Sequence, residues 1–185
     1  MEYLEAVKRY CPMDEEERLE KEVILSFLEE KGDLALLRKS EMAHMTSTAM
    51  IFNETKDKLL MVHHNIYDTW ACVGGHADGM KDLLAVAFKE AAEETGVTEV
   101  KAITENVLSL DILQVGKHYK RGSYVPNHLH LNVTYGMTAP EDVPLRIKED
   151  ENSGVMLVPI AELEVYSKED EFIKVYRKII EKVIK

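Results

Sequence analysis

Apolar residues recur along this chain with two periods, one typical of helices and one typical of strands. Helical spacing covers residues 14–31, where Asp14 stands at the N-cap position, Glu17 follows three residues later and Gly32 provides a stop. The predicted apolar stripe of this helix consists of Leu19, Val23, Ile24, Phe27 and Leu28. The segment is therefore predicted to form an amphipathic helix near the start of the chain.

Strand patterns and a second helix follow. Runs typical of strands cover 45–53, 58–63, 99–115, 128–137 and 154–159. The first two of these runs are expected to pair as a hairpin. A final helix is predicted from Ser167 to about Lys182, with Ser167 and Asp170 as its capping pair. Strands interleaved with few helices predict an α/β fold in which a mixed sheet lies between helices.

Composition and charge narrow the class of protein. A chain of 185 residues that is 45% hydrophobic can bury a sizeable core. Its formal net charge of −11 argues against a nucleic acid polymer or an anionic membrane as partner, because both are bound by basic surfaces. Cys11 and Cys72 form neither a metal-binding spacing nor a disulfide framework, and the first residues lack the apolar core of a signal peptide. We expect a cytoplasmic protein.

Three glutamates on one predicted helix indicate metal chemistry. Glu90, Glu93 and Glu94 are spaced three and four residues apart, so they share one side of a helix that Gly96 would end. Like charges at this spacing destabilise a helix, and a bound divalent cation would remove the repulsion. Carboxylates suit Mg²⁺ or Mn²⁺. Taken alone, the run is better explained as a solvated acidic face.

Glycines before this helix favour the metal interpretation. Gly74 and Gly75 predict a turn in which the backbone comes close to a ligand, and Asp78-Gly79 predicts a second tight reversal. The whole segment resembles the Nudix box, which runs from a glycine to the sequence Arg-Glu, an aliphatic, any residue, Glu-Glu, any residue, Gly and an aliphatic. The residues that match it in register are Gly75, Glu90, Glu93, Glu94, Gly96 and Val97.

Two positions depart from the box. Lys81 stands where the family has its first Glu, and Lys89 stands where it has Arg. Lys89 keeps the charge but loses the planar fork of a guanidinium, which weakens any bidentate contact with a glutamate. Lys81 reverses a charge near the cleft, and its ammonium could instead contact a substrate phosphate. Both lysines are candidate substrate-binding residues.

The resemblance implies a fold, an activity and a cofactor. It implies a Nudix-type α/β/α sandwich over about residues 44–165, and we expect a helical extension at 1–40 followed by a Nudix domain at 41–185. It also implies that Glu90, Glu93 and Glu94 are catalytic residues that hold Mg²⁺ or Mn²⁺. The expected reaction is hydrolysis of a nucleoside diphosphate linked to another group. The N-terminal helix would either pack on the domain or form a homodimer interface.

Other candidate site residues lie outside the box helix. His128 and His130 share one face of a predicted strand with Asn132 and Thr134, and this face could line the cleft or meet solvent. Glu151 is a candidate ligand or base, because many Nudix enzymes carry a glutamate in the loop before a late strand, but an exposed acidic turn explains it equally well. Gly74, Gly75 and His76 are candidate substrate-binding residues.

Several residues have simpler interpretations. His44, His63 and His64 are expected to be surface or capping residues. A zinc site from His76, His128 and His130 lacks a supporting spacing. Trp70 is expected in the core.

Two other functions compete with hydrolysis. Trp70, Cys72, Gly75 and His76 together also resemble isopentenyl diphosphate isomerase, a Nudix-fold enzyme that moves a double bond. Its catalytic cysteine, however, directly precedes the Gly-His pair, where this chain has Gly74. A catalytically weak Nudix module that binds nucleotide is the third alternative. The two lysines keep it open, although the intact glutamates argue against it.

Overall fold

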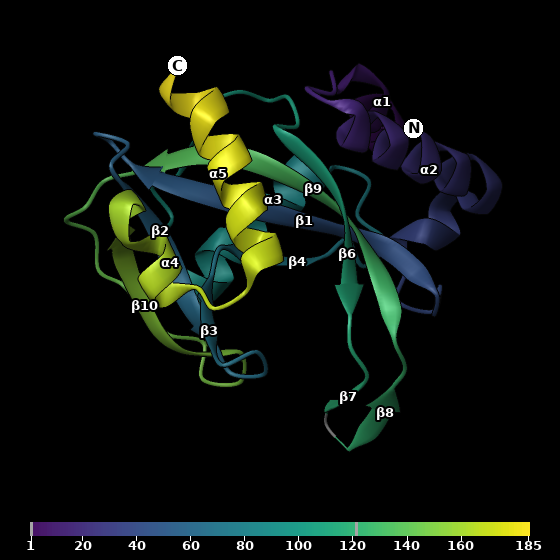
Figure 1. Cartoon of the computed structure of the whole chain (residues 1–185). Helices are drawn as coiled ribbons and strands as arrows, with labels where there is room; N and C mark the ends of the chain where they lie inside the picture. Colours follow the sequence, from purple (N-terminus) through teal and green to yellow (C-terminus); the bar gives the residue numbers. More distant parts are fainter. Residues whose placement is uncertain (1, 121) are drawn as a thin grey trace.

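A mixed eight-stranded sheet forms the centre of the structure, with helices on both of its faces (Figure 1). The computed structural model describes residues 2–120 and 122–185. The strands of this sheet are β1 (Ala43–Asn53), β2 (Lys58–His64), β3 (Thr69–Ala71), β4 (Val73–His76), β5 (Lys101–Ala102), β6 (Ser109–Val115), β9 (His128–Ala139) and β10 (Asn152–Pro159). A separate ribbon consists of β7 (His118–Lys120) and β8 (Ser123–Val125). The helical segments are α1 (Glu2–Arg9), α2 (Glu15–Lys31), η1 (Gly32–Leu36), α3 (Leu83–Thr95), η2 (Ile160–Glu162), α4 (Leu163–Tyr166) and α5 (Asp170–Ile184).

Strand β1 organises the sheet. It pairs parallel with β9 and antiparallel with β2 and β4, and the main strand order is β10-β2-β1-β9-β5. The predicted hairpin is present, with Ile51 opposite Leu60 and Phe52 opposite Leu59. The expectation of a mixed sheet between helices is therefore confirmed.

Helices cover both faces of the sheet. This is possible because successive side chains of β1 point alternately to the two faces. Ala49 and Ile51 belong to the core that α2 and α3 share, whereas Met50 and Phe52 belong to the core under α4 and α5. Neighbouring residues of a strand point to opposite faces, so an uninterrupted apolar run serves both layers. Figure 1 shows α5 on one side of the sheet and α3 on the other.

The N-terminal helices pack on the rest of the chain, which was one of their two expected roles. Ile24 and Leu28 of α2 are fully buried in the core that reaches β1 and β9. Leu19 and Val23 were wrongly assigned to the buried stripe, because their side chains are 49% and 55% exposed. Glu17 is buried in their place and forms ion pairs with α5, so the packed face of α2 is partly ionic and its hydropathy pattern misleads.

Other boundaries differ from the sequence predictions for local reasons. Helix α1 was not predicted. The run 99–115 is divided into β5 and β6, because the backbone bends repeatedly over residues 103–108 between them. Ser167 does not cap the final helix: its backbone N–H donates to the carbonyl of Leu163 and ends α4, and α5 begins only at Asp170.

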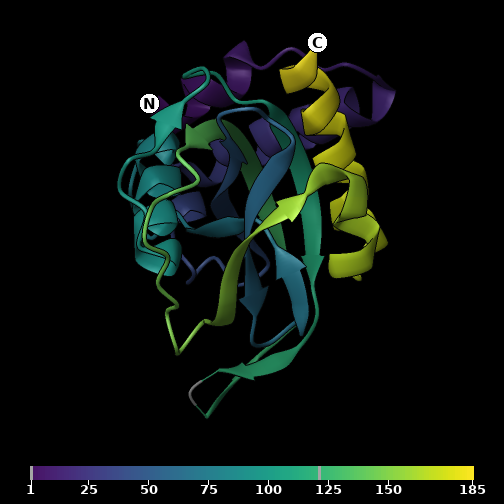
Figure 2. The same cartoon turned by 90° about the vertical axis from the view of Figure 1, so that its left-hand side faces the viewer.

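The β7–β8 ribbon extends beyond the body of the molecule (Figure 2). It connects β6 to β9, and its residues Tyr124 and Val125 line the main cavity described below. Exposed tyrosines, Tyr119 and Tyr124, pack edge to face across the ribbon at a centroid separation of 5.6 Å. The ribbon therefore places polar and aromatic groups at the rim of the cavity.

Candidate active site

The glycine-rich segment is a strand followed by a tight reversal. Gly74 and Gly75 lie in β4, paired with β1, so the predicted turn at this point is wrong. The second predicted reversal is present, because Asp78 and Gly79 have φ angles of 46° and 90°. Helix α3 then begins at the N-cap Asp82, which accepts a hydrogen bond from Ala85 N–H. The reversal and the cap together define where α3 begins after β4.

The predicted helix stop is also present. Gly96 caps α3 in the left-handed conformation with φ of 77°, and its N–H donates to the carbonyl of Ala92. A glycine adopts this conformation without the steric cost that a Cβ would bring. Helix α3 thus ends directly after Glu94 and Thr95, which fixes where the last carboxylate lies.

Three carboxylates converge where α3 faces β4. Oxygens of Glu90, Glu94 and Glu151 all lie within 4.8 Å of one another. Glu90 and Glu94 are buried, at 7% and 3% exposure, and Gly74 N–H donates to Glu94 Oε1 at 3.2 Å. A Cβ on Gly75 would lie 2.4 Å from Glu90 Cδ, so this position must lack a side chain for the carboxylate to fit. The structure thus brings Glu151 next to two of the box glutamates.

Burial makes this cluster electrostatically costly without a counterion. Burial and, after it, the neighbouring charge of Glu90 raise the pKa of Glu94 to about 8. Oxygen ligands at this spacing fit a hard divalent cation such as Mg²⁺, which would remove the repulsion. The donor set therefore fits a divalent metal ion.

Glu93 lies beside the cluster and contacts two lysines. Lys89 Nζ lies 2.9 Å from Glu90 Oε1 and 3.2 Å from Glu93 Oε2. Lys148 Nζ lies 3.2 Å from Glu93 Oε2 and 3.0 Å from Glu151 Oε2. The two ammonium groups therefore neutralise the carboxylates from the solvent side, and sequence reasoning had not identified Lys148.

Lys81 lies apart from this group. Its Nζ contacts Asp33 Oδ2 of η1 at 2.6 Å, and both side chains are about half exposed, at 49% and 54%. Lys89 is among the described residues that line the cavity, and Lys81 is not. The Lys81 side chain therefore forms an ion pair with the N-terminal segment and does not contact the carboxylate cluster.

A cavity of ≈ 540 Å³ encloses the cluster. Its walls include the residues expected on one face of β9, namely His128, His130, Asn132 and Thr134, and the box residues Gly74, Gly75 and His76. Burial, followed by the charges of neighbouring histidines, lowers the pKa of His130 to about 3. The polar face of β9 therefore lines the cleft, and it does not face bulk solvent.

Sequence reasoning missed two further groups in this cavity. His44 is buried at 5% exposure, so its assignment to the surface is wrong. It alternates with Thr46 and Thr48 on the cavity side of β1, and this alternation could have identified it. Arg38 also lines the cavity and holds Asp78 through two hydrogen bonds of 2.8 and 2.6 Å.

Trp70 and Cys72 complete the residues that the sequence singled out. Trp70 packs against the core beneath α5, and Tyr166 lies edge to face on it at 6.4 Å between centroids. Cys72 lines the cavity, and its backbone N–H donates to the Tyr176 hydroxyl at 3.1 Å. Burial raises the pKa of the Cys72 thiol to about 12. The core assignment of Trp70 therefore agrees with its packing.

Solved structures share this architecture. The chain is similar to a Caenorhabditis elegans Ap4A hydrolase in a binary complex, with 14% identity, coverage of 72% of this chain and 93% of that one, and a TM-score of 0.55. It is also similar to the Escherichia coli dihydroneopterin triphosphate pyrophosphohydrolase, with 13% identity, coverage of 76% and 94%, and a TM-score of 0.55. At these identities the likeness shows the fold alone.

A third solved structure carries a ligand. The NUDIX domain of Shewanella oneidensis NrtR, complexed with ADP ribose, is 17% identical, with coverage of 75% of this chain and 86% of that one and a TM-score of 0.53. None of the curated proteins compared matches the chain. In the described part of the chain, no helix is both long and apolar enough to cross a membrane.

The family itself follows from the sequence match. The NUDIX domain model matches residues 42–183, which is most of the chain and spans both the carboxylate cluster and the histidine-lined strand. Helix α3 carries the three glutamates that match the box. The chain therefore belongs to the NUDIX domain family and has the α/β Nudix fold.

Proposed function

We propose that this chain is a metal-dependent pyrophosphohydrolase that cleaves a nucleoside diphosphate linked to another group. The observation that carries the proposal is the convergence of Glu90, Glu94 and Glu151 in one cavity, with oxygens within 4.8 Å. A divalent cation would be bound favourably by three buried or half-buried carboxylates this close, because it would remove their mutual repulsion. A Mg²⁺ or Mn²⁺ ion held there would neutralise phosphate oxygens and lower the pKa of an attacking water.

Residues of the chain have separate roles in this proposal. Glu90, Glu94 and Glu151 would hold the metal. Glu93 would become a further ligand when Lys89 and Lys148 leave it and contact phosphate oxygens of the substrate. Phosphoryl transfer depends chiefly on positioning and on electrostatic stabilisation, so ammonium groups beside the metal suit the developing charge. Both lysines line the cavity, which supports their contact with substrate.

The size and lining of the cavity support a nucleotide-sized substrate. Its volume of ≈ 540 Å³ falls in the range of small-molecule sites. His76, His128 and His130 would contact the group attached to the diphosphate, and Gly74 and Gly75 let the backbone come close. The bound ADP ribose of the Shewanella NUDIX domain is consistent with this class of ligand.

Cys72 bears on the isomerase alternative. An isomerase of the isopentenyl diphosphate type would use a cysteine in proton transfer, and Cys72 does line the cavity. With a pKa of about 12, however, the Cys72 thiol is poorly suited to exchange a proton near neutral pH. Hydrolysis therefore remains the function that the cavity supports best.

A substrate panel tests the proposal. We expect release of a nucleoside monophosphate from at least one of nucleoside diphosphate sugars, dinucleoside polyphosphates, ADP-ribose and nucleoside triphosphates, when Mg²⁺ is present and not after chelation. Product separation by ion-exchange chromatography measures it. If no compound turns over with Mg²⁺ or Mn²⁺ but one binds in calorimetry, the chain is a nucleotide-binding module and the hydrolase proposal fails.

A further inference from the structure

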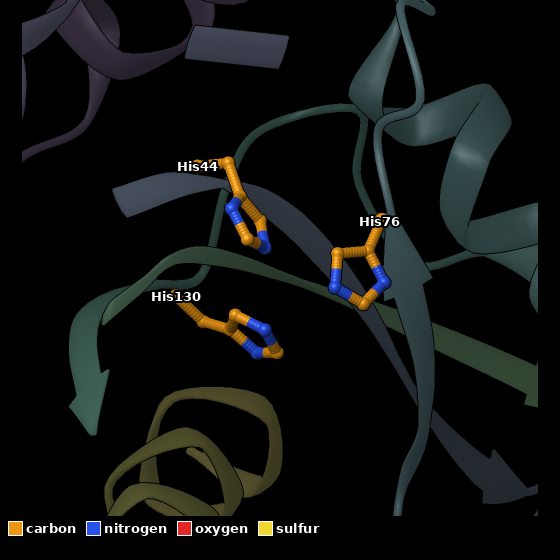
Figure 3. A group of neighbouring side chains, drawn as sticks. All are labelled: His44, His76 and His130. Carbon is orange, nitrogen blue, oxygen red and sulfur yellow. The ribbon is translucent and has the colours of Figure 1, made fainter. Parts of the chain in front are cut away.

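Three imidazole rings from three different strands meet in the cavity. His44 lies on β1 directly opposite His130 of β9, and His76 lies on β4, which pairs with β1 on its other side. Ring centroids are 5.0 Å apart for His44 and His76, 5.2 Å for His44 and His130, and 4.8 Å for His76 and His130. Figure 3 shows the rings turned toward one shared space. One nitrogen from each lies within 4.8 Å of the other two.

His44 has a buried nitrogen that faces no hydrogen-bond partner. Its Nδ1 lies 3.1 Å from the Ser40 carbonyl oxygen, which can only accept, so Nδ1 carries the proton. Within the described residues, Nε2 is buried and makes no hydrogen bond. Because the other nitrogen is protonated, Nε2 has a free lone pair. A buried lone pair without a partner is energetically costly. Histidines that bind metals are commonly oriented by a hydrogen bond from their other nitrogen to a carbonyl, as Nδ1 of His44 is here.

His128 fixes the protonation of His130 in a similar way. Nδ1 of His128 lies 2.9 Å from the Pro126 carbonyl oxygen and must donate to it, which leaves its Nε2 as an acceptor in the neutral ring. That Nε2 lies 3.3 Å from Nε2 of His130, so the proton between them belongs to His130. In this tautomer the lone pair of neutral His130 is on Nδ1. Binding a metal through Nε2 instead moves the proton to Nδ1, because a ligating nitrogen must be deprotonated.

The surrounding charge permits a cation. Arg38 is a cationic residue near His44 and His130, and its guanidinium is held by the Asp78 carboxylate in a bidentate pair. The pair is close to neutral as a unit. A Zn²⁺ ion here would therefore face little net repulsion from this side of the cavity.

We propose that His44, His76 and His130 form a binding site for one Zn²⁺ ion, separate from the carboxylate cluster. Three imidazole nitrogens select a borderline-soft metal over Mg²⁺, which prefers oxygen. Nitrogens around a tetrahedral Zn²⁺ lie about 3.4 Å apart, given Zn–N bonds of about 2.1 Å. The three nitrogens, which lie within 4.8 Å of one another, would move closer together when they bind the ion. Because all three histidines line the cavity, the fourth position is open to a ligand there.

Metal content and spectroscopy test the site without reference to turnover. Purified full-length chain is dialysed against Zn²⁺ and then metal-free buffer, and retained zinc is measured by mass spectrometry. We expect one Zn²⁺ per chain, and we expect Co²⁺ in its place to show the intense visible absorption of a four-coordinate nitrogen site. His44→Phe and His130→Phe should each weaken zinc binding at least about 100-fold. Circular dichroism confirms that each variant is folded.

Matched variants separate this site from the others. His63→Phe changes a histidine on β2 that contacts Ser153 outside the cavity, and it should keep wild-type zinc affinity. Glu90→Gln should also keep it, because the carboxylates are not the ligands. If His44→Phe does not fold, His76→Gln provides the same comparison.

Three results would overturn the zinc proposal. One is zinc retained well below one equivalent by the wild-type chain. Another is unchanged affinity in folded His44→Phe or His130→Phe. The third is loss of zinc from Glu90→Gln alone, which would assign the metal to the carboxylates. None of these outcomes decides whether the chain hydrolyses diphosphates.

Discussion

At the scale of single residues, burial separates the acidic side chains of α3 into two kinds. Glu94 is almost fully buried and shares the cluster with Glu90 and Glu151, whereas Glu93 is 42% exposed and contacts Lys89 and Lys148. Residues adjacent in sequence therefore have different surroundings, although helical spacing places them on one side. Only the packing of α3 against β4 makes this distinction.

Glu94→Gln should lower kcat/KM at least about 100-fold while the fold is kept, because one oxygen ligand is replaced by an amide at nearly constant shape. Hydrolysis of the best substrate from the panel, with Mg²⁺ varied, measures it. Glu99→Gln changes an exposed glutamate just beyond α3 and serves as control. Wild-type rates in Glu94→Gln, with normal thermal unfolding, would contradict the proposed role of Glu94.

At the scale of elements, the glycines of β4 serve close packing and not a reversal. The pair Gly74-Gly75 is typical of a turn, but here both residues continue a strand. Their missing side chains leave room for Thr48 on one side and for the Glu90 carboxylate on the other. Strand β4 and helix α3 can therefore approach closely enough for the strand backbone to contact the cluster, as it does through Gly74 N–H and Glu94.

Gly75→Ala should lower turnover about 100-fold, because the new Cβ would meet Glu90 Cδ at 2.4 Å and must displace its carboxylate. The collision involves the end of a flexible side chain, so strand pairing survives and the melting temperature changes little. Steady-state kinetics and calorimetry measure the two effects. Gly116→Ala, where an added Cβ meets no atom within 4 Å, is the matched control. Unchanged turnover in Gly75→Ala would show that this close contact does not position Glu90.

At the scale of the whole molecule, a buried ionic contact joins the two ends of the chain. Glu17 of α2 is 1% exposed and lies 3.0 Å from Lys178 and 3.2 Å from Lys182 of α5. Burial raises the pKa of Glu17, but hydrogen bonds from Tyr10, the Met13 N–H and Lys178 outweigh it and lower the pKa to about 2. The carboxylate is therefore charged in the folded state well into acid.

Glu17→Ala should lower the free energy of unfolding at pH 7 by about 3 kcal/mol, because two largely buried lysines lose a partner. The folded pKa lies below the usual value of 4.5, so this stabilisation is present above pH 4.5 and is lost as the pH falls toward 2. The difference between wild type and variant should shrink over that window. Urea unfolding at several pH values measures it.

Glu16→Ala provides the control for this contact, because Glu16 is exposed on the same helix. It should change stability little at any pH. An equal difference between wild type and Glu17→Ala at pH 7 and at pH 3 would contradict the assigned ionisation. A stability loss in Glu16→Ala as large as that in Glu17→Ala would show that helix content matters more than the buried contact.

Sequence by itself determined the features that depend on neighbours along the chain. The caps Asp14 and Gly96, the hairpin of β1 and β2, and the register of the box glutamates all follow from local spacing, because helical and strand periods repeat over a few residues. The mixed sheet between helices followed from the order of these elements. These predictions hold in the structure.

Tertiary structure alone decided which distant residues meet. Glu151 joins the box glutamates, and His44 meets His130, only because β1, β9 and β10 are brought together by pairing between segments far apart in the chain. The sequence carries no local signal for such encounters, since strand order and face are set by the packing of the whole core. The box residues were enough to predict a carboxylate site. The cavity that these carboxylates share with three histidines is formed only in the folded structure.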